Sequence, residues 1–266
     1  MTLSAPRPTR PTASTLAPGV YILGAGPGDP ELITVRGQRL LQQADVILYA
    51  NSLVPQQVLD WTRPEAEKIG TASMTLENIL PLMIERVRAG HSVVRLHSGD
   101  PSLYSAIHEQ IQTLAEAEIP FEIIPGISAF QAAAAKLNAE LTIPGLVQSI
   151  ILTRISGRTQ VPEAEELASL AAHKTSLCLY LSARHVEAAQ AQLLEHYPAD
   201  TPVAICYRVG WPDERICTVP LSAMAATTQS ESLIRTTLYI ISPALAATPA
   251  RSRLYNPEHN HLFRPR

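Results

Sequence analysis

A short apolar segment that ends in a Gly-Asp-Pro turn constrains the fold of this chain more than any other feature. Residues 93–96 include two β-branched side chains and predict a buried strand, which Gly99, Asp100 and Pro101 then break. Ligands of open α/β sheets bind where the strands end. Glycine removes the Cβ that would keep a ligand from the backbone, and the aspartate adds a carboxylate beside free N–H groups. The turn is therefore predicted to line a site for a polar small molecule.

A similar turn follows the first predicted strand of the chain. Residues 19–23 predict this strand, and the glycine-rich turn at residues 24–30 precedes a helical pattern at residues 31–44. A glycine-rich turn that opens a helix is typical of phosphate and dinucleotide sites. Here Pro27 and Pro30 remove two N–H donors that such a site needs. An isolated turn of this type is usually only a surface turn, and its occurrence after two strands is what favours a ligand site.

Strands and helices alternate in the first half of the chain and follow another pattern in the second. The alternation predicts a mostly parallel sheet with helices on both faces, including helices near residues 75–89 and 102–117. After residue 147 the pattern predicts a mixed-sheet α+β domain, in which residues 215–219 pair with the strand at 203 as a hairpin. The fold class is α/β, and the expected limits are a disordered tail at 1–18, an N-terminal α/β domain at 19–125, a C-terminal α/β domain at 126–245 and a flexible tail at 246–266.

Composition weighs against several classes of function. The net charge of −3 argues against a protein that grips nucleic acid through a broad basic surface. The apolar runs are shorter than the roughly 20 residues of a membrane span, so no membrane partner is expected. Cys178, Cys206 and Cys217 have no CxxC spacing and are expected to be buried free thiols of a cytoplasmic protein, with no metal site.

A Pro-Gly break also follows the strand predicted at residues 121–124. Ser128 and an alanine-rich helix come directly after it. The free N–H groups at the helix start, the hydroxyl and the small side chains suit a flat or thin ligand. Close packing between helices explains the same residues equally well, so the segment leaves both interpretations open.

Taken together, these motifs resemble those of the tetrapyrrole methyltransferase family, which uses S-adenosylmethionine. The resemblance covers residues 19–243. Its marks are the loop at 24–30 with residues 31–34, the turn at 98–101, the segment 125–129, and Pro202-Val203-Ala204 with Arg215. Within the family, residues 96–104, 140–144 and 152–159 are most similar to the branch that methylates C11 of precorrin-4, or of its cobalt form, in cobalamin biosynthesis.

The resemblance implies two α/β domains with the cofactor in the cleft between them, in a homodimer that binds a small-molecule tetrapyrrole. Leu181 stands where many relatives carry methionine, a conservative change for an apolar wall. Asp100 is expected on an exposed turn, where its replacement would weaken cofactor binding before it affected folding. The resemblance implies cofactor contacts at nine residues, which are Pro27, Gly99, Asp100, Leu103, Ser128, Ala129, Leu181, Ala204 and Thr237.

Arginines are expected at the substrate, because its acetate and propionate carboxylates suit bidentate pairing. Arg36, Arg154 and Arg158 are the candidates, since each lies beside a motif expected at the site. Solvated surface arginines would give the same pattern.

Other substrate contacts follow from the family pattern and from the Gly99 turn. The family pattern places Gly26, Gly28 and Asp29 on the macrocycle side of the site. His97 and Tyr104 flank the turn, where His97 could bind a carboxylate, relay a proton or lie in the core. A nucleophilic side chain is not predicted, because an electron-rich pyrrole carbon is itself a nucleophile, and the acid and base groups stay unassigned.

Several rival functions stay open on the sequence. Other branches of the family methylate C20, C17 or the C2 and C7 positions of uroporphyrinogen, and relatives of this fold act on macromolecules. A dinucleotide-binding oxidoreductase is the rival from another class, led by the loop at 24–30. It needs an acidic residue at the end of the second strand to hold a ribose, and the chain has Tyr49, Ala50 and Asn51 there.

Overall fold

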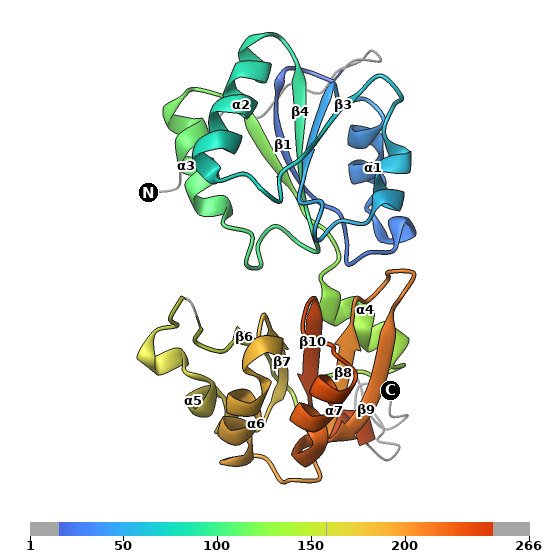
Figure 1. Ribbon diagram of the computed structural model, residues 1–266, viewed down its shortest axis with the longest axis vertical. Helices are drawn as coiled ribbons and strands as arrows, with labels where there is room; N and C mark the ends of the chain where they lie inside the picture. Colours follow the sequence, from blue (N-terminus) through green and yellow to red (C-terminus); the bar gives the residue numbers. More distant parts are fainter. Residues whose placement is uncertain (1–15, 158, 247–266) are drawn as a thin grey trace, which may run out of the picture. The chain divides into compact units, whose positions relative to one another are not determined.

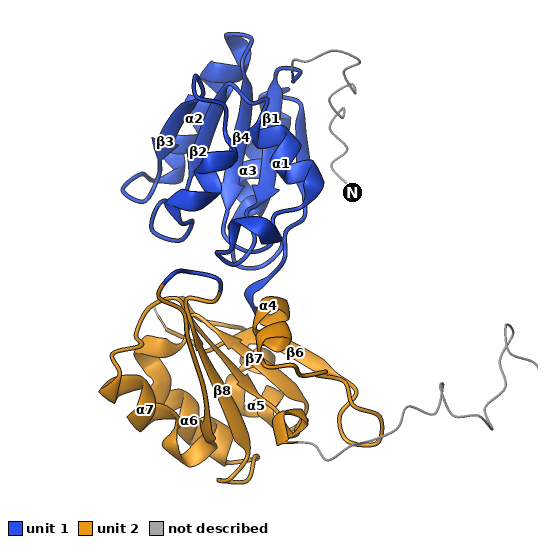
Figure 2. Ribbon diagram, turned by 90° about the vertical axis from the view of Figure 1, so that its right-hand side faces the viewer, with its two compact units in different colours: residues 1–129, 210–212 blue, residues 130–209, 213–266 orange. Residues whose placement is uncertain are grey.

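The computed structural model describes residues 16–157 and 159–246 (Figure 1). By its internal contacts the chain divides into two compact units. Unit 1 comprises Met1–Ala129 and Gly210–Pro212, and unit 2 comprises Phe130–Val209 and Asp213–Arg266 (Figure 2). The domain limits expected at 19–125 and 126–245 stay a prediction. The expected tails fall largely on residues 1–15 and 247–266, which lie outside the described residues.

Unit 1 contains a five-stranded sheet in the order β3-β2-β4-β1-β5, and all of its strand pairs are parallel. The strand before the Gly99 turn is β4, which lies at the centre of this sheet. Gly24 of β1 pairs with His97 of β4, so the two Gly-Asp-Pro turns leave the same edge. The parallel sheet is confirmed. Its strands are β1 (Gly19–Gly24), β2 (Val46–Tyr49), β3 (Glu67–Gly70), β4 (Ser92–His97) and β5 (Phe121–Ile124).

Helices cover both faces of this sheet (Figure 1). On one face α1 and a 3-10 helix pack through Leu40, Leu41 and Val58, and on the other α2 and α3 pack through residues such as Met83 and Leu114. Apolar residues three or four apart place each helix's buried face against the sheet. The helices are α1 (Val35–Leu41), α2 (Leu76–Arg88) and α3 (Ile107–Glu116), with 3-10 helices at Pro30–Leu32 and Gln56–Trp61.

Two helices of unit 1 begin later than the sequence predicts. The helix expected from residue 31 begins at Val35, because Thr34 is extended and its hydroxyl accepts a hydrogen bond from Gly37 N–H (3.0 Å). The helix expected from residue 102 begins at Ile107. Tyr104 and Ala106 before it have φ values of 54° and 49°, in the left-handed region that a helix cannot include.

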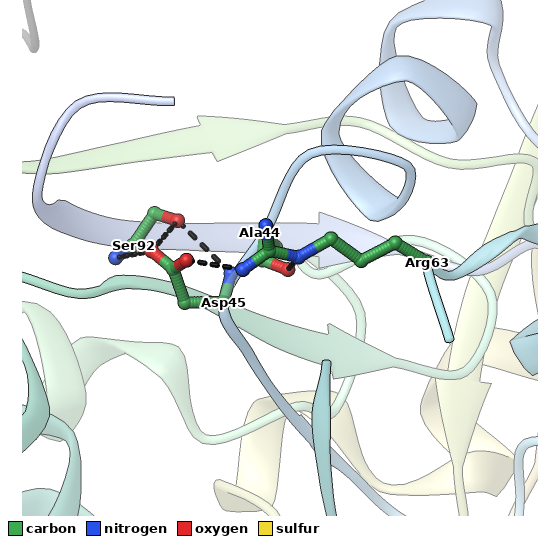
Figure 3. A network of polar contacts seen from close by, with 4 residues as sticks. All are labelled: Ala44, Asp45, Arg63 and Ser92. Carbon is green, nitrogen blue, oxygen red and sulfur yellow. Dashed lines mark hydrogen bonds and ion pairs between the residues drawn. The ribbon is translucent and has the colours of Figure 1, made fainter. Parts of the chain in front are cut away.

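A polar network joins the amino ends of β2 and β4, at the edge opposite the two turns (Figure 3). The carboxylate of Asp45 accepts hydrogen bonds from Ser92 N–H (2.8 Å) and Ser92 Oγ (2.7 Å) and forms an ion pair with Arg63. Arg63 Nε in turn donates to Ala44 O (3.0 Å). Burial by itself would raise the pKa of Asp45, but the Ser92 hydrogen bonds and the Arg63 charge outweigh it and hold that pKa below its usual value.

We expect Asp45→Ala to lower the free energy of unfolding by about 2 kcal/mol, because Ser92 N–H and Arg63 lose their shared acceptor. The folded pKa of Asp45 lies below its unfolded value, so this stabilisation is present above about pH 4 and is lost as the pH falls. Urea unfolding at pH 7 and pH 3 measures both effects. Asp60→Ala at an exposed position is the control, and equal losses for the two variants at pH 7 would contradict the prediction.

Unit 2 contains a five-stranded mixed sheet in the order β6-β7-β10-β8-β9. β6 and β7 are parallel, whereas β10 and β9 pair antiparallel with their neighbours. The predicted mixed sheet is confirmed, and so is the hairpin of β8 and β9. The strands are β6 (Ile150–Arg154), β7 (Ser176–Tyr180), β8 (Pro202–Tyr207), β9 (Arg215–Pro220) and β10 (Thr237–Ile241).

One face of the unit 2 sheet packs against α5, α6 and α7 through a single core that includes Leu167, Leu193 and Met224. Cys178 and Cys206 are buried, Cys217 is half-buried, and all three are free. Burial raises the pKa of Cys178 and of Cys206 to about 12, so neither is a thiolate at neutral pH. The helices are α4 (Ala129–Lys136), α5 (Leu167–Ala171), α6 (Val186–Leu194) and α7 (Met224–Ser230), with 3-10 helices at Glu163–Glu165, Ala183–His185, Leu221–Ala223 and Pro243–Ala246.

Within residues 16–157 and 159–246, none of the helices has the length and hydrophobicity needed to cross a membrane.

Candidate functional site

The turns after β1, β4 and β5 are bonded to one another at the carboxyl edge of the unit 1 sheet. Gly99 N–H donates to Gly26 O (2.7 Å), and Gly26 N–H donates to Gly99 O (3.2 Å). Asp100 extends this link, since Gly126 N–H donates to its Oδ2 (2.9 Å). The loops that the sequence singled out separately therefore form one structure.

Two glycines make this close approach possible. A Cβ on Gly24 would lie 2.5 Å from Gly99 O and 2.6 Å from Gly126 N, and a Cβ on Gly126 would lie 2.8 Å from Gly24 Cα and closer still to Gly99 O. These are backbone atoms, which cannot rotate away as a flexible side chain can. Close backbone contact thus requires glycine at residues 24 and 126.

The carboxylate of Asp100 accepts hydrogen bonds from the backbone of the protein itself. Besides Gly126 N–H, it accepts from Ser102 N–H (2.9 Å) and from the Ser102 hydroxyl. Burial would raise the pKa of Asp100, but these hydrogen bonds hold it below its usual value. The expectation of an exposed turn is wrong, because Asp100 is half-buried and joins two loops. Its replacement should therefore affect folding as well as ligand binding.

The other predicted residues of unit 1 lie on or beside these loops. Gly26, Pro27 and Gly28 are buried in the first turn, and Asp29 caps the 3-10 helix at Pro30–Leu32 by accepting from Glu31 N–H (2.9 Å). The Cα of Ser128 is 3.8 Å from the position a Cβ on Gly99 would occupy. Leu103 N–H donates to Asp100 O (3.2 Å), while Tyr104 is exposed and Ala129 begins α4.

Unit 2 places two of its three predicted cofactor residues at one edge of its sheet. Leu181 follows β7, with φ 54° and a side chain that is 67% exposed. Thr237 begins β10, pairs with Tyr207 at the end of β8, and donates from Oγ1 to Leu233 O (2.7 Å). Ala204 lies inside the sheet, where it pairs with Ile240 and is fully buried. Their contact with a cofactor stays a prediction.

Two of the three arginines proposed for substrate carboxylates are already engaged with the protein. Arg36 Nη2 forms an ion pair with Glu122 (2.5 Å), although its side chain is 61% exposed. Arg154 donates from Nη1 to Thr159 O (2.8 Å) and from Nη2 to Gln160 O (3.0 Å). Arg158 lies outside the described residues. These interactions give Arg36 and Arg154 structural roles, and their contact with substrate stays a prediction.

His97 is buried in β4, and its burial together with the charge of Arg95 lowers its pKa to about 3. The imidazole is therefore neutral at pH 7, so it can bind a carboxylate only as an N–H donor without charge.

Arg95, which the sequence motifs did not predict, is buried and lies two residues before His97 on the same face of β4. The sequence does contain a signal for Arg95, because a charged side chain within an apolar strand is rarely buried without a partner. Among the residues that the structure describes, no group of three or more His, Cys, Asp or Glu side chains is placed to hold a metal ion.

The sequence of motifs and the fold agree with one family of enzymes. The family model for tetrapyrrole (corrin/porphyrin) methylases matches residues 19–225. This chain belongs to that family. Nothing in the comparisons supports the alternative of a dinucleotide-binding oxidoreductase.

Individual tetrapyrrole methylases resemble the chain over nearly their full length. The precorrin-4 C(11)-methyltransferase of Pseudomonas aeruginosa is 47% identical over 247 residues, which are 92% of this chain and 98% of that protein. The crystal structure of a cobalt precorrin-4 methyltransferase superposes with a TM-score of 0.82 at 44% identity, covering 85% of this chain and 95% of the other. A uroporphyrin-III C-methyltransferase from Thermus thermophilus, in complex with S-adenosyl homocysteine, has a TM-score of 0.70 at 26% identity, covering 86% and 99%.

We expect Arg154→Ala to loosen the loop at residues 155–160, because the guanidinium donates to two carbonyls of that loop. Limited digestion with subtilisin, which does not require an arginine, should cleave the variant severalfold faster near Thr159 and Gln160. The KM for the tetrapyrrole should rise more than the Kd for S-adenosylmethionine. Arg39→Ala is the control, because Arg39 is exposed and has no assigned role. An unchanged KM would remove Arg154 from the substrate site.

Proposed function

We propose that this chain transfers the methyl group of S-adenosylmethionine to C11 of precorrin-4 or cobalt-precorrin-4 in cobalamin biosynthesis. The observation that carries the proposal is the 47% identity to a precorrin-4 C(11)-methyltransferase over 92% of this chain. Identity falls to 26% for the uroporphyrin-III enzyme of the same fold. The C11 branch is therefore favoured over the branch that acts on uroporphyrinogen.

The residues of unit 1 fit S-adenosylmethionine as a ligand. Gly99 has φ +66°, and Ser128 Cα lies 3.8 Å from the position of its missing Cβ, so the turns after β4 and β5 bring these two predicted cofactor residues side by side. Ser128 adds a hydroxyl, and Leu103 and Ala129 add apolar surface of small to medium size. We propose contacts to the cofactor from Pro27, Gly99, Asp100, Leu103, Ser128, Ala129, Leu181, Ala204 and Thr237.

Leu181 supports this proposal through its backbone. A left-handed backbone is unfavourable for leucine, and such strain is usually retained where it presents a side chain to a ligand. An exposed apolar side chain at the edge of the unit 2 sheet suits the flat adenine ring or the thioether chain of the cofactor.

The chemistry needs positioning more than it needs a reactive side chain. S-adenosylmethionine supplies an electrophilic methyl group on a charged sulfur, and the pyrrole-type carbon of the substrate supplies the electron pair. Holding two reactants in line contributes roughly 7 to 11 kcal/mol to the rate. The bonded loops at Gly26, Gly99 and Gly126 provide a rigid backbone for this purpose. Their rigidity is the contribution of unit 1 to catalysis.

We further propose that the protein works as a cytoplasmic homodimer that binds no nucleic acid. Sedimentation velocity at micromolar concentration should give a mass near twice 28.9 kDa. A single species at the monomer mass would remove the dimer from the proposal and leave the methyl transfer untouched.

The decisive experiment is incubation of the purified protein with methyl-labelled S-adenosylmethionine and either precorrin-4 or cobalt-precorrin-4. NMR of the product then locates the label on the ring. We expect the label at C11 with at least one of the two substrates. Label at another ring carbon would assign the chain to another branch, and no transfer to either substrate would overturn the proposal.

A further inference from the structure

Arg95 carries a buried positive charge that no carboxylate balances among the described residues. Its side chain lies on β4 of unit 1 and is 6% exposed. Nη1 donates to Thr71 Oγ1 (2.9 Å), and Nε has no hydrogen-bond partner within the described part of the chain. Burial lowers the pKa of Arg95 to about 10, so the group is still charged at neutral pH. A buried charge without a partner is strongly unfavourable, which indicates that a bound anion completes the site.

The guanidinium lies near the functional edge of the sheet. Thr71, which it contacts, directly follows β3, and its backbone N–H donates to Tyr49 O at the end of β2 (2.9 Å). Arg95 itself lies two residues before His97, the last residue of β4, and the Gly99 turn follows. Arg95 Nη1 therefore lies toward the carboxyl end of β3, on the side of β4 away from β1 and at the same carboxyl edge of the sheet as the two Gly-Asp-Pro turns.

His97 Nε2 and Gln110 Oε1 are two further buried polar atoms on this face of the sheet. The two side chains interact with each other, since a hydrogen bond from Gln110 opposes the lowering of the His97 pKa. Gln110 is oriented by its Nε2, which donates to Ala106 O (3.2 Å) and Ser105 O (3.4 Å). His97 is close enough to Arg95 for the guanidinium charge to lower its pKa. The Nε–H of Arg95 is left without a partner among the described residues, and a buried donor of this kind is typical of a ligand site or of bound water.

We propose that Arg95 binds a carboxylate of the tetrapyrrole substrate. This inference rests on the proposed function, because it assumes a substrate with acidic side chains. Arg95 fits the role better than Arg36 and Arg154. The ion pair of Arg36 and the two carbonyl contacts of Arg154 already occupy those guanidinium groups, whereas Arg95 Nε–H is unused. Thr71 would then act as a positioning residue that holds the guanidinium.

The test compares wild type, Arg95→Met and Arg88→Met with two tetrapyrroles. Methionine keeps the length and the apolar packing of the arginine stem, and Arg88 is an exposed residue of α2 whose loss changes the net charge equally. Steady-state kinetics with precorrin-4 give KM, calorimetry gives the Kd for S-adenosylmethionine, and fluorescence quenching gives the Kd for uroporphyrin III, an octacarboxylate.

For Arg95→Met we expect KM for precorrin-4 and Kd for uroporphyrin III to rise roughly ten- to a hundredfold, with the cofactor Kd within twofold of wild type. Arg88→Met should match wild type in the KM for precorrin-4 and in both Kd values. If Arg95→Met leaves both tetrapyrrole constants unchanged, bound water satisfies the guanidinium and the inference is wrong.

The same measurements separate this inference from the proposed function. If wild type fails to methylate precorrin-4 but Arg95→Met still weakens uroporphyrin III binding tenfold, the proposed function fails and the carboxylate site stands. If Arg95→Met does not fold, Arg95→Lys replaces it, since lysine keeps the charge and loses the planar donors. We then expect at least a threefold weaker Kd for uroporphyrin III, and an unchanged Kd would overturn the inference.

Discussion

Gly126→Ala is expected to destabilise the protein by about 3 kcal/mol or more and to abolish S-adenosylmethionine binding. The added methyl would lie 2.8 Å from Gly24 Cα and closer still to the carbonyl oxygen of Gly99. That carbonyl accepts from Gly26 N–H, so it cannot move without breaking the link between the first two turns. Overpacking against backbone is destabilising because no side chain can adjust to relieve it.

Urea unfolding and calorimetric titration with S-adenosylmethionine measure the two effects. Gly90→Ala is the matched control, because Gly90 has φ +90° with nothing within 4 Å of a Cβ position. Only backbone strain of about 1 kcal/mol should appear there, with cofactor affinity unchanged. If Gly126→Ala proved as stable as Gly90→Ala and bound the cofactor normally, the packing of the three turns would be wrong.

Asp100→Asn is expected to lower kcat/KM by about a hundredfold and the free energy of unfolding by about 2 kcal/mol. Both carboxylate oxygens accept N–H groups, from Ser102 and from Gly126. An amide keeps one acceptor and presents an N–H to the other donor, so one contact between the turns after β4 and β5 becomes repulsive. The loop that would position the methyl donor then loses its link to Gly126.

The second Gly-Asp-Pro turn supplies the control for stability. Asp29 caps its short helix through Oδ1 alone, and an asparagine oxygen can accept the same bond. Asp29→Asn should therefore change the free energy of unfolding by less than about 0.5 kcal/mol. Equal stability losses in the two variants would show that the carboxylate of Asp100 does not join the loops.

The pH dependence of the Asp100 contribution has a definite sign. The folded pKa of Asp100 lies below its unfolded value, because hydrogen bonds to the ionised form outweigh burial. The stabilisation is thus present above about pH 4 and is lost as the pH falls through the folded pKa. The stability difference between wild type and Asp100→Asn should shrink between pH 5 and pH 3, and a constant difference would contradict this.

Local sequence patterns were sufficient to predict the strands and to miss the starts of two helices. The strands β1, β4 and β5 and the hairpin of β8 and β9 follow from short β-branched runs bounded by glycine and proline. The beginnings of α1 and α3 depend on the extended backbone of Thr34 and the left-handed backbones of Tyr104 and Ala106. The Thr34 cap is a local contact with Gly37, and the spacing of apolar residues does not contain it. The same spacing does not contain the sign of φ at Tyr104 and Ala106.

The residues of the candidate site were also only partly predictable from local sequence patterns. The sequence marked Gly99, Asp100 and Gly126 as turn residues, but it placed Asp100 on an exposed turn. Only the folded chain brings Gly126 N–H to the Asp100 carboxylate across 26 positions of sequence. Nearness to motifs in the sequence pointed to Arg36 and Arg154 as substrate-binding residues. In the structure both guanidinium groups bind other groups of the protein, whereas Arg95 keeps an Nε–H without a partner among the described residues.

By itself, the sequence determined the α/β class, the parallel first sheet, the mixed second sheet and the family, because alternating apolar runs and ordered turn motifs are local properties of the chain. Tertiary structure alone decided which loops bond to each other and which charged groups lack a partner. Hydrogen bonds and buried charges depend on atoms that meet only after folding, so residues such as Arg95 become visible as candidates only in three dimensions.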